Sequence, residues 1–134
     1  MTVRLAEYHD WPIIQALHDA SGKPPYPLWE RQCDVSGWWM LVEDRQRRPL
    51  GCLQIAMSRP QAFLDLLCVP QVFTTRMKWV TIKALLRATF SLLKRMGVKT
   101  VLFQADPSYA QWQHIITKHG ARYLHSYPTY VIGV

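Results

Sequence analysis

One carboxylate interrupts an otherwise apolar segment near the middle of the chain. Asp65 lies within residues 62–69. The alternation of a strand puts it on one face with three apolar residues, Phe63, Leu67 and Val69. A carboxylate among apolar groups holds a proton more readily, which suits a general base. Two roles therefore stay open for Asp65: a proton acceptor in a reaction, or a paired carboxylate in the sheet.

A row of basic side chains follows in the next segment. Arg76, Lys83, Arg87 and Lys94 are spaced 7, 4 and 7 positions apart, so on an α-helix they share a stripe about 40° wide. No acid lies between residues 75 and 96 to neutralise them. The stripe indicates either a solvated helix face or a surface for an anionic partner such as nucleic acid. It lacks the regular aromatic residues that stack single strands.

The charge of the whole chain agrees with this uneven distribution. The sequence has 134 residues with 16 Lys+Arg and 9 Asp+Glu, a formal net charge of +7. Residues 1–65 carry 7 basic and 8 acidic side chains (net −1), whereas residues 66–134 carry 9 basic side chains and one acid (net +8). Length and composition predict a single globular domain over residues 1–134. The second half is expected to face an anion.

Several classes of protein and site are not indicated. No apolar run approaches the roughly 18 residues of a membrane span, and the charged first residues are unlike a signal peptide. The expected location is therefore the cytoplasm. Three widely spaced cysteines, with no CxxC pair, are expected to be reduced and buried. The histidine spacing predicts no metal site.

Hydrophobic periodicity and turn residues predict the elements that position these groups. Strands are expected over residues 3–6, 38–44, 50–58, 62–69, 100–104, 123–125 and 129–133, with an irregularity at Gly51. Helices are expected after a cap at Asp10, over residues 75–96 up to Gly97, and over residues 108–119. The fold class is therefore α/β (α+β), with the order β-α-β-β-β-α-β-α-β-β. A mixed, mostly antiparallel sheet is expected, with a meander before the long helix.

This order, with a basic helix directly after the third meander strand, resembles the GNAT superfamily of acyl-CoA-dependent N-acetyltransferases. In that family a strand ending in Val leads into an Arg/Gln-x-x-Gly-x-Gly/Ala loop that grips the pyrophosphate of coenzyme A. Here the segment 66–69 ends in Val69, and Arg76 opens the corresponding stretch. Trp79 and Thr81 stand where the family has small residues.

A second likeness lies near the end of the chain. The family pattern Asn-x-x-x-Ala, followed by Tyr-Glu-Lys-x-Gly-Phe or Gly-Ala, is matched by Asp106 to Ala110 and by Lys118 to Ala121. Ile116 stands where family members usually carry the Tyr that protonates the departing thiolate. The resemblance covers nearly the whole chain in element order and these two places in motif.

The resemblance implies roles for individual residues. Acetyl-CoA would be the acyl donor, and a small-molecule or protein amine would be the acceptor. The residues expected to contact the donor are Leu67, Cys68, Val69, Arg76, Met77, Lys78, Trp79, Val80 and Thr81. Asp65 would be the base, and one of four tyrosines, above all Tyr109 or Tyr127 but also Tyr123 or Tyr130, would replace the acid missing at Ile116. Trp79 would either fill the phosphate cradle or turn aside into the core.

A non-catalytic alternative stays open beside the enzyme. Short GNAT-like proteins of tailed phages, including internal virion components, are similar in their altered glycine loop and their Gly-Ala ending. On that alternative the chain would belong to a virion or to the host cytoplasm. Its basic stripe would bind an anionic partner such as nucleic acid.

Overall fold

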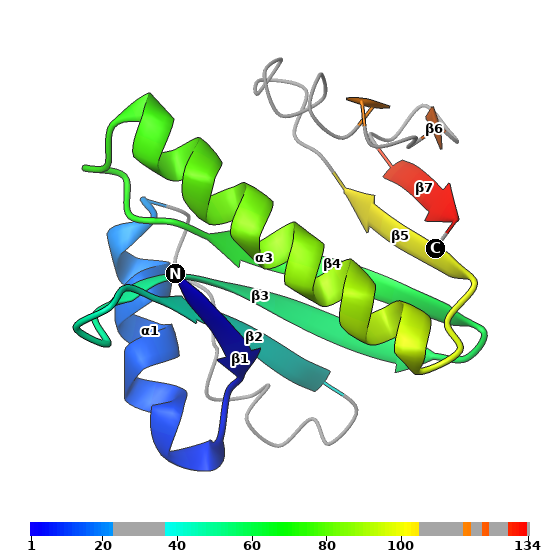
Figure 1. Cartoon of the computed structure of the whole chain (residues 1–134), viewed down its shortest axis with the longest axis horizontal. Coiled ribbons are helices and arrows are strands. Elements are labelled where there is room, and N and C mark those ends of the chain that lie inside the picture. Colours follow the sequence, from blue (N-terminus) through cyan, green and yellow to red (C-terminus); the bar gives the residue numbers. More distant parts are fainter. Residues whose placement is uncertain (23–36, 105–116, 119–121, 124–128, 134) are drawn as a thin grey trace.

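The computed structural model of the chain describes residues 1–22, 37–104, 117–118, 122–123 and 129–133 (Figure 1). The strands are β1 (Thr2–Leu5), β2 (Gly37–Glu43), β3 (Pro49–Ser58), β4 (Gln61–Cys68), β5 (Thr100–Gln104), β6 (Arg122–Tyr123) and β7 (Thr129–Gly133). The helices are the 3-10 helix η1 (Tyr8–Asp10), α1 (Trp11–Ala20) and α3 (Thr75–Arg95). The mixed fold expected from the sequence is confirmed. The helix expected over residues 108–119 lies outside the described residues except for Thr117 and Lys118, which are helical.

The described strands form one sheet in the order β1-β2-β3-β4-β5-β7-β6. β2, β3 and β4 are the expected antiparallel meander. β4 and β5 are parallel, with Gln61 opposite Thr100 and Leu64 opposite Phe103. The helix α3 makes the connection between these two strands, as a parallel pair requires.

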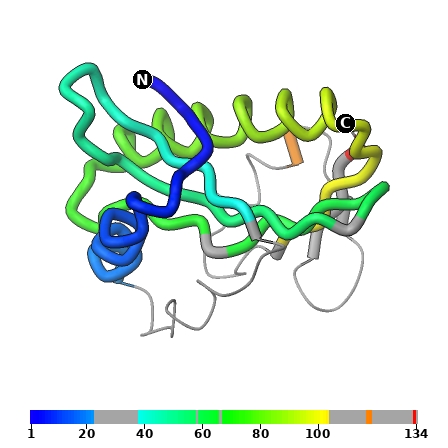
Figure 2. Tube along the Cα trace, turned by 90° about the horizontal axis from the view of Figure 1, so that it is seen from below, coloured from blue at the N-terminus to red at the C-terminus, as the bar shows by residue number. Residues whose placement is uncertain are grey.

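The two helices cover opposite faces of the sheet, as Figure 2 shows. Strand alternation explains why both faces are apolar, because successive side chains of β2 point to opposite sides. Met40 and Val42 belong to the hydrophobic cluster that includes Leu85 and Leu93 of α3. A second cluster joins β2 to α1; its members are Ile14, Leu17, Trp39, Leu41, Cys52 and Cys68. Both described cysteines are buried, as expected.

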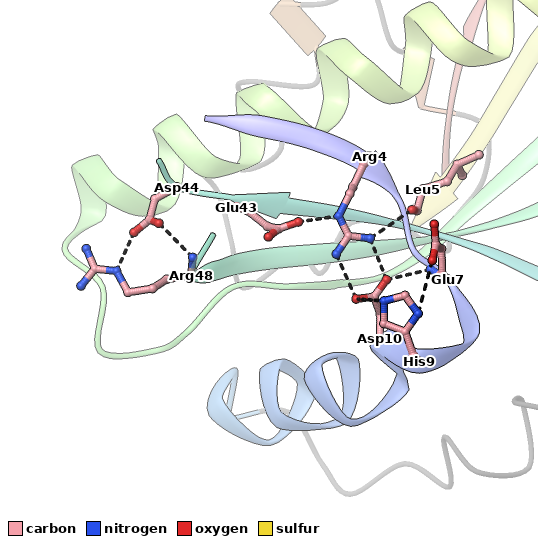
Figure 3. A network of polar contacts seen from close by, with 8 residues as sticks. All are labelled: Arg4, Leu5, Glu7, His9, Asp10, Glu43, Asp44 and Arg48. Atoms are coloured by element: carbon pink, nitrogen blue, oxygen red, sulfur yellow. Dashed lines mark hydrogen bonds and ion pairs between the residues drawn. The ribbon is translucent and has the colours of Figure 1, made fainter. Parts of the chain in front are cut away.

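The amino-terminal strand is fixed by an arginine that the sequence patterns did not single out (Figure 3). Arg4 donates from two nitrogens to the carboxylate of Asp10, over 2.7 and 2.9 Å. It also donates to Glu43 of β2. Asp10 was expected to cap α1, but its side chain makes no cap bond there. It accepts instead from Arg4 and from the amide of Glu7, over 2.8 Å. The network therefore ties β1 to β2 and to the start of α1.

Both ends of α3 are capped by residues suited to the task. Thr74 is the N-cap, and its hydroxyl accepts from the amide of Met77 over 3.2 Å. At the other end Gly97 has a φ of +81°, where glycine carries no steric penalty. The amide of Gly97 donates to the carbonyl of Lys94 and that of Val98 to the carbonyl of Leu93. This is a Schellman ending, and it confirms the helix stop expected at Gly97.

Candidate functional site

The last residues of β4 leave the regular ladder of the sheet. Gln54 is opposite Asp65 and Cys52 is opposite Cys68, so Leu66 and Leu67 together face the single residue Leu53. This is a β-bulge, which redirects the backbone and is common beside active sites. The parallel pairing with β5 ends at Leu64, while β4 continues to Cys68. Figure 1 shows the two strands diverging toward their carboxyl ends.

Asp65 lies where these two irregularities meet. It is the first residue after the last β4–β5 pair and directly precedes the bulge. It is half-buried, and its cross-strand neighbour Gln54 is almost completely buried. Asp65 is therefore a half-buried carboxylate near the end of β4, and this position is compatible with the general-base hypothesis.

The first turn of α3 offers backbone donors to an anion. The first amides of a helix have no partner within the helix. The amide of Met77 donates to the hydroxyl of Thr74, and the amide of Lys78 donates to the carbonyl of Thr74. Thr74, Thr75 and Arg76 are exposed, and within the described residues their amides have no hydrogen-bond partner. These three consecutive donors form the part of the helix that is open to a phosphate.

Two cations lie in the same turn. Arg76 is exposed and Lys78 is half-exposed, and no acidic residue accompanies them in the first turn. A positive charge at a helix amino terminus opposes the macrodipole and costs stability. Arg76 and Lys78 therefore favour an external anion over a role in holding the helix together.

The second turn of α3, which the resemblance implied to be part of the phosphate loop, is regular helix. Trp79, Val80 and Thr81 are within the helix, where amides bond to the preceding turn, so we do not place phosphate donors there. The side chain of Thr81 is fully buried, and its hydroxyl donates to the carbonyl of Met77 over 2.8 Å. Trp79 is half-buried, but it does not pack on either described core cluster.

A close approach brings the start of α3 against the end of β4. A Cβ on Gly51 of β3 would lie 3.0 Å from the carbonyl oxygen of Cys68 and 3.0 Å from Cγ2 of Thr81. Because Gly51 has no side chain, Thr81 in the second turn of α3 can pack directly on the sheet beside Cys68, the last residue of β4. The end of β4 and the second turn of α3 thus meet at one packed contact around Gly51.

The other expected site residues are placed as follows. Leu67 is partly buried against the cluster under α3, Cys68 is fully buried, and Val69 is half-buried after the strand. On the helix, Met77 is partly buried and Val80 is 45% exposed. Tyr109 and Tyr127, the expected acids, lie outside the described residues.

Three polar residues were missed by the sequence patterns. Gln54 and His18 are each 2% exposed. Gln54 interrupts an apolar strand, and His18 continues the helical stripe of Ile14 and Leu17, so both could have been found as polar residues at core positions. Thr74 could have been found as a cap residue before an apolar stripe.

The basic stripe is exposed as expected. Arg76, Lys83, Arg87 and Lys94 are all exposed on α3. Within the described part of the chain none of the four forms an ion pair. Among the same residues, no group of three His, Cys, Asp or Glu could hold a metal ion, and no described helix is long and apolar enough to cross a membrane.

Comparison by sequence finds no relative. No protein-family model matches the chain, and no curated protein matches it. The fold can therefore be compared only with solved structures.

Solved structures of acetyltransferases match the fold over nearly the full length. The ribosomal-protein-S18-alanine N-acetyltransferase of Escherichia coli matches with a TM-score of 0.81 at 14% identity, over 99% of this chain and 92% of that chain. A GNAT-family acetyltransferase of Elizabethkingia anophelis with acetyl-CoA bound matches with 0.79 at 15% identity, over 99% and 97%. The PaiA N-acetyltransferase of Thermoplasma acidophilum in complex with coenzyme A matches with 0.69 at 11%, over 98% and 97%. The chain therefore has the fold of the GNAT superfamily.

Proposed function

We propose that this protein is an acyl-CoA-dependent N-acyltransferase that uses acetyl-CoA and an amine acceptor. The observation that carries the proposal is the junction of α3 with β4. At the start of α3 lie three amides that have no partner among the described residues, together with two cations. The second turn of the same helix packs beside the end of the bulged strand β4. Structures of the same fold contain acetyl-CoA or coenzyme A.

The phosphates of the donor would be held at the first turn of α3. The amides of Thr74, Thr75 and Arg76 would donate to one phosphate, and Arg76 and Lys78 would neutralise its charge. No glycine is present among these residues, so more of the binding energy would come from side chains than from a close backbone approach.

The reaction would follow from the residues at the end of β4. The amine attacks the thioester carbonyl, and Asp65 accepts the amine proton directly or through water. Amides near Leu67–Val69 would stabilise the oxyanion. The carbon–sulfur bond then breaks, and Tyr109 or Tyr127 would return a proton to the thiolate. The products are an amide and coenzyme A.

Binding of the donor tests the phosphate site. Acetyl-CoA should raise the melting temperature of the protein. Arg76→Ala and Lys78→Ala should each weaken its affinity by roughly 10-fold or more, because each removes a charged hydrogen bond. Lys83→Ala, an exposed cation two turns further along α3, is the control and should leave the affinity unchanged. Absence of binding at millimolar acetyl-CoA would contradict the proposal.

Turnover with an amine acceptor tests the base. Asp65→Asn should lower kcat by about 10²- to 10⁴-fold, the usual contribution of a general base, and should leave the affinity for acetyl-CoA unchanged. Asp19→Asn in α1 removes an exposed carboxylate and should leave kcat unchanged. If Asp65→Asn lowered the melting temperature but left kcat unchanged, Asp65 would stabilise the sheet beside its cross-strand neighbour Gln54 and would not act as the base.

A further inference from the structure

We propose that the outer face of α3 is a docking surface for the phosphate backbone of a nucleic-acid duplex. We call the four exposed residues Arg76, Lys83, Arg87 and Lys94 the basic face. The proposal goes beyond the proposed acyl transfer, because three of the four residues lie further along α3 than the phosphate site.

The basic face is free to bind an anion. Its four side chains are exposed and have no carboxylate partner among the described residues. Three acids of the described amino-terminal part pair with other cations: Asp10 and Glu43 pair with Arg4, and Asp44 pairs with Arg48. The positive charge of the helix is therefore not neutralised by the described residues around it.

The length and straightness of the row fit a linear polyanion. Arg76 and Lys94 are 18 residues apart, which is about 27 Å along a helix axis at 1.5 Å per residue. A duplex rises about 3.4 Å per base pair, so the row spans roughly eight pairs. A compact ligand such as one nucleotide would leave most of it empty.

The composition of the face separates a duplex from other partners. The remaining exposed residues between Arg76 and Lys94 are Val80 and Ser91. Protein interfaces centre on aromatic and apolar anchors, and Val80, 45% exposed, is the single apolar side chain here among the described residues. Single strands need a series of aromatic side chains for stacking. The four residues of the face include none, and the half-buried Trp79 is a single aromatic side chain beside them. Contacts with phosphates alone match the face best, and these would be independent of base sequence.

A salt titration with a labelled 24-base-pair duplex tests the proposal. Four phosphate contacts give a slope of roughly −3.6 for log affinity against log salt concentration, or roughly a 150-fold loss between 50 and 200 mM salt. Arg87→Ala combined with Lys94→Ala should halve the slope and reduce the loss to roughly 12-fold. Lys83→Ala alone should reduce the slope by about 0.9.

The control removes the same charge from another surface. Arg45 and Arg47 are exposed in the turn between β2 and β3, and Arg47 has a φ of 60° that glycine adopts without strain. Arg45→Ala combined with Arg47→Gly should keep the wild-type slope. An equal fall in both double variants, a flat response to salt, or equal competition by polyglutamate would overturn the proposal. Acetyl-CoA affinity, measured on the same variants, should not change, so failure here is distinct from failure of the proposed enzyme activity.

Discussion

Two buried threonines of α3 differ in one hydrogen bond. Thr81 and Thr89 are both fully buried. The hydroxyl of Thr81 donates to the carbonyl of Met77, whereas that of Thr89 has no hydrogen-bond partner in the part of the chain that the structure describes. An unpaired buried hydroxyl lowers stability, because it gives up its bonds to water without replacement.

We therefore expect opposite outcomes from the same substitution at these two positions. Thr89→Val should raise the free energy of unfolding by about 1 kcal/mol, since it removes only an unpaired polar atom. Thr81→Val should lower it by about 1 kcal/mol, since it removes a hydrogen bond. Urea denaturation of both variants measures the difference. A fall in stability for Thr89→Val would show that its hydroxyl has a partner.

At the scale of elements, the distance between α3 and the sheet depends on the absent side chain of Gly51. The carbonyl of Cys68 and the methyl of Thr81 both occupy the space that a Cβ would need. β-strand glycines often mark such close approaches. The junction that carries the candidate site is therefore set by a residue outside the site.

Gly51→Ala should lower the free energy of unfolding by about 1–3 kcal/mol through overpacking. Thr81→Ser removes the methyl group at this contact and keeps the hydroxyl, so it should recover part of the loss when combined with Gly51→Ala. Chemical denaturation of the two single variants and the double variant gives the coupling energy. Strict additivity of the two changes would contradict the packing described for this junction.

Local patterns were sufficient to predict most of the described elements and the exposure of α3. The 3.6-residue period placed the basic face outward and Leu85 and Leu93 inward, and both are confirmed. Such predictions depend only on residues close in sequence. The GNAT fold followed from the order of those elements and is confirmed by solved structures.

Features set by contacts between distant residues could not be predicted in the same way. The bulge at Leu66 and Leu67 is defined by how β4 pairs with β3. The register of such a pair is not determined by the sequence of one strand alone. Arg4 of β1 joins Asp10 to Glu43 of β2, which is 39 positions from Arg4 in the sequence, whereas a local cap was expected for Asp10. The roles of Asp65, Arg76 and Lys78 stay predictions, to be tested by the variants above.

At the scale of the whole molecule, the two halves of the chain use charge differently. In the first half, carboxylates and guanidinium groups neutralise one another, as in the Arg4–Asp10–Glu43 network (Figure 3). In α3 the cations have no such partners among the described residues. Acid should therefore weaken the fold through the first half of the chain, where paired carboxylates lose their charge.

The acid sensitivity of folding should depend on Asp10. Hydrogen bonds from Arg4, despite burial, lower the pKa of Asp10 from 3.8 to about 2. Because the folded pKa is the lower one, this stabilisation is complete above about pH 5, and most of it is lost as the pH falls to about 2. The loss should be about 2 kcal/mol, from the size of the shift.

Urea denaturation at pH values between 5 and 2 measures this loss. Asp10→Asn should have a lower free energy of unfolding than the wild type at pH 5. The difference between the two should narrow by about 2 kcal/mol as the pH falls to 2. Asp19→Asn, which changes an exposed carboxylate with no arginine partner among the described residues, should keep a constant difference in free energy of unfolding from the wild type. If the difference for Asp10→Asn were also constant, the ion pair with Arg4 would add nothing to stability. β1 would then be held only by its pairing with β2 and by its apolar contacts.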